Sequence, residues 1–135
     1  MLTELSARFH HIGVACRDLD AETAVWIGLG YRVEGADFED PLQRVRGRFV
    51  IGAGPRLELL VGTSDDSAAT RMVRRGVKYY HQAFTVPDLA HAAGKLRERR
   101  GKMIVGPTPA VAFGGRPIAF FVMPNLDMIE LIEAP

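Results

Sequence analysis

A short pattern that occurs twice constrains the fold of this chain more than any other feature. The stretches His11–Leu19 and His81–Leu89 share a histidine, an aspartate and a leucine, and one constant offset relates all three pairs. A second match follows later in each half, where Leu57–Leu60 corresponds to Ile129–Ile132 at almost the same offset. An internal repeat of this length indicates two copies of one structural unit.

Two further kinds of residue follow the same repeat. Phe49 and Phe121, each followed by valine, keep the offset of the second match and are predicted to be counterparts. Each half also carries one histidine and one glutamate at corresponding places, which are His11 with Glu58 and His81 with Glu130. These four polar residues are the first candidates for a functional site.

Apolar alternation and turn residues predict the same βαβββ order in each half. In the first half the predicted elements are a strand at 8–16, a helix at 19–28, a strand at 31–34, a loop at 35–43, and strands at 44–51 and 56–61. In the second half they are a strand at 79–86, a helix at 88–100, a strand at 102–105, a loop at 106–116, and strands at 117–123 and 127–133. Asp18 and Asp88 are predicted N-caps of the two helices.

The two halves are joined by a stretch that predicts one more helix. It is expected to begin near Ser64 or Asp65 and to end at Gly76. We therefore predict an α+β protein with a single domain over 1–135, comprising module one at about 8–61, a linker helix at about 63–76 and module two at about 78–133.

Strand alternation predicts which way the polar residues point. His11 shares a face with Gly13, whereas the bulky Ile12 and Val14 occupy the other face. His81 likewise shares a face with small residues, and the bulky residues of its strand occupy the other face. Both glutamates lie opposite the leucine and isoleucine side chains of their strands. Each histidine and glutamate is therefore expected to face a cavity lined by small residues.

Charge favours a metal ion in such a cavity. Two carboxylates in one buried space repel each other and resist desolvation. Two neutral imidazoles, two carboxylates and one divalent cation add up to zero charge. A second interpretation treats the histidines as hydrogen-bonded strand residues and the glutamates as the solvent face of half-buried strands.

Composition excludes several classes of function. The formal charge of +1 gives no reason to expect nucleic acid or a membrane as a partner. The single cysteine, Cys16, rules out an internal disulfide framework and suits a reducing compartment. The N-terminal residues lack the pattern of a secretory signal, so a cytoplasmic location is expected.

Several motifs, taken in their order, resemble the vicinal oxygen chelate superfamily, which includes glyoxalase I, bleomycin-resistance proteins and extradiol dioxygenases. They are His10-His11-Ile12-Gly13-Val14-Ala15, Arg17-Asp18-Leu19, Leu29-Gly30, Glu58-Leu59-Leu60, His81, Pro87-Asp88-Leu89, Gly114-Gly115-Arg116 and Ile129-Glu130-Leu131. The resemblance extends from Phe9 to Glu133, and within the superfamily the chain is most similar to methylmalonyl-CoA epimerase.

The resemblance implies a fold and a set of metal ligands. Two βαβββ modules would form an open, barrel-like cavity around one divalent ion of cobalt, nickel, zinc, manganese or iron, frequently in a homodimer. The implied ligands are His11, Glu58, His81 and Glu130, which the repeat also selects.

The resemblance also implies an activity. A chelated acyl oxygen acidifies the neighbouring C–H bond, and a carboxylate then moves the proton through an enolate. Glu130 is the implied catalytic carboxylate, whereas Leu42 stands where the epimerase has its second glutamate. The expected substrate is an acyl-CoA or another anionic carbonyl compound, with Arg116, Gly115, Gln43 and Arg48 as candidate substrate-binding residues.

Other activities of the same superfamily remain open. One is a lyase like glyoxalase I acting on an α-hydroxy-carbonyl compound, and another is a non-catalytic protein that binds a small molecule and confers resistance. An extradiol dioxygenase would need iron held by two histidines and one carboxylate, and Glu58 as a fourth ligand argues against it.

Overall fold

The computed structural model describes residues 1–135, which divide into two compact units. The first unit comprises His11–Tyr80, and the second comprises Met1–His10 together with His81–Pro135. Each unit contains the predicted βαβββ arrangement, so the α+β class and the duplicated plan are confirmed. None of the helices has the length and apolar character that crossing a lipid bilayer requires.

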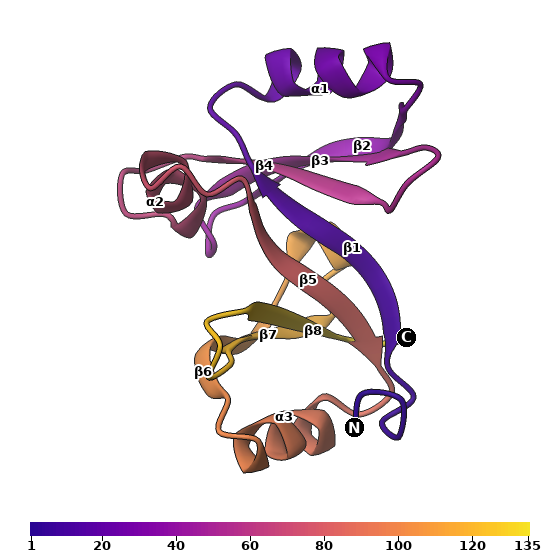
Figure 1. Ribbon diagram of the computed structural model, residues 1–135, viewed down its shortest axis with the longest axis vertical. Helices are drawn as coiled ribbons and strands as arrows, with labels where there is room; N and C mark the ends of the chain where they lie inside the picture. Colours follow the sequence, from indigo (N-terminus) through magenta and orange to yellow (C-terminus); the bar gives the residue numbers. More distant parts are fainter. The chain divides into compact units, whose positions relative to one another are not determined.

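The first unit is a mixed sheet with the strand order β2-β3-β4-β1. Its elements are β1 (Arg8–Ala15, of which Arg8–His10 belongs to the second unit), α1 (Leu19–Gly28), β2 (Arg32–Asp40), β3 (Val45–Ile51), β4 (Leu57–Gly62) and α2 (Ala68–Arg74). Strands β1 and β4 are parallel, and β2, β3 and β4 are antiparallel neighbours. Helix α1 covers one face of this sheet (Figure 1).

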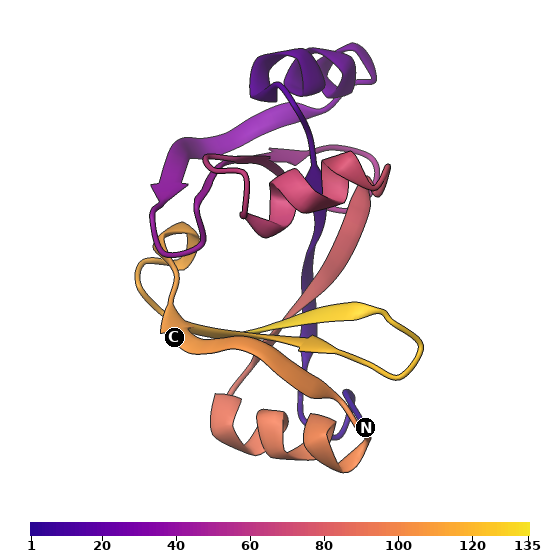
Figure 2. The same ribbon diagram turned by 90° about the vertical axis from the view of Figure 1, so that its left-hand side faces the viewer.

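The second unit repeats this order with β5-β8-β7-β6. Its elements are β5 (Tyr79–Val86, of which Tyr79 and Tyr80 belong to the first unit), α3 (Leu89–Glu98), β6 (Lys102–Pro109), the short 3₁₀ helix η1 (Val111–Phe113), β7 (Pro117–Val122) and β8 (Met128–Glu133). Strands β5 and β8 are parallel, as β1 and β4 are. Helix α3 covers one face of the sheet, and the N-terminus of the chain lies beside it (Figure 2).

Both major helices begin where the sequence predicts. The Asp18 carboxylate accepts a hydrogen bond from the Ala21 N–H at 2.8 Å, and the Asp88 carboxylate accepts one from the His91 N–H at 2.9 Å. These caps satisfy N–H groups that have no partner within the helix. Asp18 and Asp88 are therefore repeated for a structural reason.

The helix-facing sides of the strands supply the core of each unit. In the first unit Val14, Leu19, Val50 and Leu59 form a buried cluster, and Cys16 belongs to it. In the second unit Leu89, Leu96, Phe121 and Leu131 do the same. Burial of these side chains, at about 1.5–3 kcal/mol each, holds each helix on its sheet.

Two predicted loops are shorter than expected, because the strand before each of them continues into it. The stretch 35–43 is mostly strand, since β2 runs on to Asp40 after an irregularity between Glu34 and Phe38, where Gly35 has a φ of +72°. Likewise β6 runs on to Pro109 through two register shifts, and Gly106, with a φ of +95°, absorbs one of them. Bulges of this kind let turn-forming residues remain within a strand pair.

The linker helix is also shorter than predicted. Its N-cap is Ser67, whose hydroxyl accepts a hydrogen bond from the Thr70 N–H at 3.1 Å, and neither Ser64 nor Asp65 caps it. The Thr70 hydroxyl donates in turn to the Ser64 carbonyl at 2.7 Å, so residues before the helix fold back onto its first turn. In the second unit α3 ends at Glu98, earlier than the predicted end at Arg100.

Candidate metal centre

In the first unit the histidine and the glutamate of the repeat lie side by side. Gly13 on β1 pairs with Glu58 on β4, and His11 stands two residues before Gly13 on the same face of its strand. His11 is fully buried and Glu58 is 4% exposed. The imidazole Nε2 of His11 lies 3.2 Å from the carboxylate Oε1 of Glu58.

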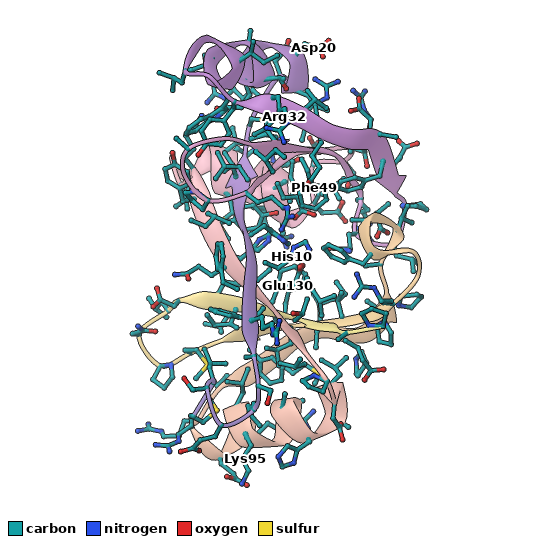
Figure 3. All side chains as sticks on the ribbon, turned by 90° about the vertical axis from the view of Figure 1, so that its right-hand side faces the viewer. His10, Asp20, Arg32, Phe49, Lys95 and Glu130 are labelled. Carbon is teal, nitrogen blue, oxygen red and sulfur yellow. The ribbon has the colours of Figure 1, made fainter.

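The second unit contains the same arrangement. Ala83 on β5 pairs with Glu130 on β8, and His81 stands two residues before Ala83. His81 is 4% exposed and Glu130 is 2% exposed. Their potential ligand atoms lie within 4.8 Å of each other. Figure 3 shows Glu130 on the side of the sheet away from α3, whose outer surface carries Lys95.

A phenylalanine packs edge-on against each histidine. In the first unit the ring centroids of His11 and Phe49 are 5.4 Å apart with an interplanar angle of 77°. In the second unit the partner of His81 is Phe120, at 5.2 Å and 82°. Edge-to-face contacts of this kind fix the orientation of a ring and exclude water from one side of it.

The repeat in the sequence predicts Phe121 as the counterpart of Phe49, and this prediction is wrong, because the counterpart is Phe120. Phe49 pairs with Glu58 in the β3–β4 ladder, whereas the residue paired with Glu130 in the β7–β8 ladder is Phe120. Phe121 instead points into the α3-side core and is fully buried there. The connection from phenylalanine to glutamate is longer by a single position in the second unit, so a constant sequence offset selected the wrong neighbour.

The chemistry of these side chains fits a divalent metal ion. A buried carboxylate is costly unless a cation or hydrogen-bond donors compensate its charge. Each pair offers an imidazole nitrogen and a carboxylate oxygen, the donor set that suits zinc, cobalt, nickel, manganese and iron. All four residues are buried and of the types that hold such ions.

Arg48 does not share a face with Phe49. Its Nε and Nη2 donate to the two oxygens of Asp37 at 2.7 and 2.6 Å, and its Nη1 donates to Asp20 and to the Thr23 hydroxyl on α1, both at 3.0 Å. Figure 3 shows Asp20 on α1 and Phe49 on the side of the sheet away from that helix. These contacts give no support to substrate binding by Arg48.

The paired charges shift the titration of both partners. Hydrogen bonds from Arg48 hold the pKa of the Asp37 carboxyl below its ordinary value of 3.8. The same bonds raise the pKa of the Arg48 guanidinium. Arg48 therefore stays positively charged, and its side chain links β3 to α1 and β2.

Gln43 and Leu42 lie in the turn after β2. The side chain of Asp40, which is 1% exposed, accepts hydrogen bonds from the backbone N–H groups of Leu42 and Gln43 at 3.1 and 3.2 Å. The Gln43 amide donates to the other oxygen of Asp40 at 3.1 Å. Leu42 itself is 66% exposed. Asp40 thus organises the turn in which the predicted substrate contact Gln43 stands.

Arg116 and Gly115 belong to the loop that follows η1. Gly114 and Gly115 have φ values of +65° and +84°, which glycine adopts without strain. The Arg116 guanidinium donates to the backbone oxygens of Phe113 and Glu133 at 3.1 and 3.0 Å and lies 5.9 Å from the centroid of the Phe113 ring. This cation is held by the backbone of the second unit.

Comparisons with known proteins agree with this architecture. A family model described as the Glyoxalase/Bleomycin resistance protein/Dioxygenase superfamily matches residues 10–120. No functionally curated protein matches the chain.

Solved structures with the same fold include epimerases. A hypothetical protein from Bacillus halodurans is 24% identical with a TM-score of 0.81, and the match covers 96% of each chain. Methylmalonyl-CoA epimerase from Mycobacterium tuberculosis is 23% identical with a TM-score of 0.78, covering 94% of this chain and 88% of that one. A variant of Streptomyces coelicolor methylmalonyl-CoA epimerase, in complex with 2-nitronate-propionyl-CoA, is 27% identical with a TM-score of 0.77, covering 94% of each chain.

Proposed function

Because this chain belongs to the Glyoxalase/Bleomycin resistance protein/Dioxygenase superfamily, we propose that it is a metal-dependent epimerase or isomerase of an acyl-CoA or a related anionic carbonyl compound. The observation that carries the proposal is the pair of buried, register-equivalent histidine–glutamate sets, His11 with Glu58 and His81 with Glu130. The likeness to an epimerase that binds an acyl-CoA analogue supports the substrate class.

In this proposal the two pairs hold one divalent ion, and residues 1–135 work as one domain around it. When bound, that ion polarises an acyl oxygen and so acidifies the adjacent C–H bond. Glu130 is the proposed proton carrier, because a buried carboxylate beside a substrate carbon can take and return a proton. Phe49 and Phe120 hold the imidazoles in position and keep water away from them.

Epimerisation needs a proton donor on the second face of the substrate, and Leu42 supplies none. The lack of a carboxylate at this position favours a second candidate, a glyoxalase I-like lyase or isomerase. In such an enzyme one carboxylate removes the proton and returns it elsewhere on the substrate. The two candidates share the metal site and differ in the number of carboxylates that must act.

Metal content is the first test of the proposal. We expect about one equivalent of a divalent first-row metal per chain in the purified protein, measured by elemental analysis. The double variant Glu58→Ala/Glu130→Ala should lose the metal, and Glu39→Ala, which removes an exposed carboxylate from β2, should retain it. A metal-free wild type after incubation with cobalt, nickel, zinc and manganese would refute the proposal.

Proton exchange tests the chemistry separately. The metal-loaded protein in deuterated water should exchange the α-hydrogen of methylmalonyl-CoA or another acyl-CoA, read by mass spectrometry. Glu130→Gln should lower this exchange by at least about 100-fold while the fold persists. Full exchange in that variant would eliminate Glu130 as the proton carrier.

We also propose that the protein functions as a homodimer. Light scattering at several protein concentrations measures the mass directly. A monomer at all concentrations would remove the dimer from the proposal and leave the metal site untouched.

A further inference from the structure

A groove in the first unit lies away from the histidine–glutamate pair. It consists of two adjoining cavities of about 540 and 350 Å³, which share Cys16, Arg17 and Val73. One wall is formed by α1, and the other by α2 and the segment that follows it as far as Lys78. The larger cavity is within the size range of small-molecule sites.

The walls of the groove are apolar and accessible. Ala21 and Val25 stand one turn apart on the same side of α1 and face Val73 and Val77 across the groove. Val25 is 59% exposed and Val77 is 38% exposed. An aliphatic body placed between these side chains would remove apolar surface from water.

The charged side chains of the groove are paired, with one exception. Glu22, whose side chain is 9% exposed, accepts hydrogen bonds from Lys78 on one oxygen and from the Trp26 indole on the other. Arg74 pairs with Asp65, and Asp18 caps α1. Arg17, at the junction of the two cavities, makes no side-chain hydrogen bond or ion pair.

None of the four proposed metal ligands lines the groove. Cys16, which does line it, has the opposite strand parity to His11 and belongs to the core beneath α1. Occupying the groove therefore makes no use of the proposed metal ligands, and the inference is independent of the proposed function.

We propose that this groove binds an organic anion with an aliphatic body and a single carboxylate. The aliphatic part packs between Val25, Val73 and Val77, and the carboxylate accepts hydrogen bonds from the Arg17 guanidinium. A ligand without the negative charge loses this contact and binds less tightly.

Cys16 provides a readout that is independent of activity. Burial raises the pKa of its thiol to about 11, and its Sγ donates to the Leu60 carbonyl at 3.4 Å. The thiol is therefore a slow nucleophile at neutral pH. As the single cysteine of the chain, it gives an unambiguous labelling rate. A ligand in the groove should slow this labelling further.

The test uses octanoate and, as a neutral match, octanol. Octanoate is expected to shift the amide resonances of residues 15–25 and 73–78 in a saturable way and to slow labelling of Cys16. Octanol should bind about threefold more weakly, the change expected from losing one exposed charge pair.

Two variants and a control locate the contacts. Arg17→Gln should raise the dissociation constant of octanoate about threefold without changing that of octanol, and Val25→Gln should weaken both ligands several-fold. Arg32→Gln, which removes an exposed cation on β2 (Figure 3), should change neither. Non-saturable shifts, shifts outside the groove, or equal binding of octanoate by Arg17→Gln and the wild type would each overturn the proposal.

Discussion

Phe120 is the structural counterpart of Phe49, although the sequence pattern aligns Phe49 with Phe121. Each of the two counterparts is paired across a β-ladder with the buried glutamate of its unit and packs edge-on against the buried histidine. The duplicated site is therefore a set of three residues in each unit, comprising a histidine, a glutamate and a phenylalanine. The next residue in each strand, Val50 or Phe121, points into the helix-side core.

This alternation predicts different effects for two adjacent substitutions. Phe120→Leu should weaken metal retention or slow turnover, because the His81 imidazole loses the ring that orients it. Phe121→Leu should lower the free energy of unfolding by about 1–2 kcal/mol, since it removes volume from a fully buried core position. Urea denaturation and elemental analysis of both variants separate the two effects. Loss of metal in Phe121→Leu alone would contradict the assignment.

Metal binding should stabilise the folded protein. An ion that binds the native state alone, at about 100 times its dissociation constant, adds about 2.7 kcal/mol to the free energy of unfolding. We therefore expect the melting temperature to fall when a chelator is added and to recover when the metal is restored. Glu58→Ala/Glu130→Ala should melt at the same temperature with and without chelator. An unchanged melting temperature in the wild type would argue against the metal site.

The Arg48–Asp37 pair should make stability depend on pH in the acid range. Asp37 has a lower pKa in the folded state than its ordinary 3.8, so its pairing stabilises the fold above that value. The contribution is lost as the pH falls through the lower, folded-state pKa. Arg48→Met should reduce the free energy of unfolding by about 1 kcal/mol at neutral pH, with a smaller difference in acid.

Arg46→Met is the matched control for that prediction. Arg46 is exposed on the same strand and makes no side-chain hydrogen bond or ion pair. Arg46 lowers the pKa of Asp37 only through a charge effect smaller than that of Arg48. Its substitution should therefore change the free energy of unfolding far less than Arg48→Met does at both neutral and acid pH, measured by urea denaturation. A loss equal to that of Arg48→Met would show that general charge, and not the Asp37 contact, is responsible.

Substitution of glycine by alanine should have opposite effects on the stability of the fold at two positions. A Cβ on Gly62 would lie 3.0 Å from the Thr70 backbone nitrogen and would collide with the Ser67 and Thr70 hydroxyls, so Gly62→Ala should destabilise the fold by about 1–3 kcal/mol. Gly94 lies within α3 with open space around it, so Gly94→Ala should stabilise the fold by about 0.5–1 kcal/mol. Thermal denaturation of the two variants checks both signs.

The sequence was informative where the determining interactions are local. The start of α1 followed from its aspartate cap, and β5 followed from simple alternation. Prediction from the sequence failed where pairing between strands overrides a local turn signal. Gly35 and Gly106 were interpreted as loop residues, but cross-strand partners on β3 and β7 continue the ladders beyond them.

The surroundings of the Arg48 and Asp40 side chains also could not be predicted from the local sequence. Strand parity places Arg46 and Arg48 on one face but does not say whether that face meets solvent, a helix or a cavity. Only the packing of α1 against the sheet gives Arg48 its partners Asp20 and Thr23. Asp40 lies in the stretch that was expected to be a loop, and the structure buries it as the acceptor that organises a turn.

The sequence by itself determined the duplication, the order of the elements and the two histidine–glutamate sets, because an internal repeat and the period of a strand are properties of neighbouring residues. The tertiary structure decided which phenylalanine meets each histidine and which face each cation occupies. Those outcomes depend on how many residues lie between paired strands and on which surface a distant helix covers. The local sequence pattern does not determine either quantity, because each is fixed when segments distant in the sequence pack together to bury apolar surface.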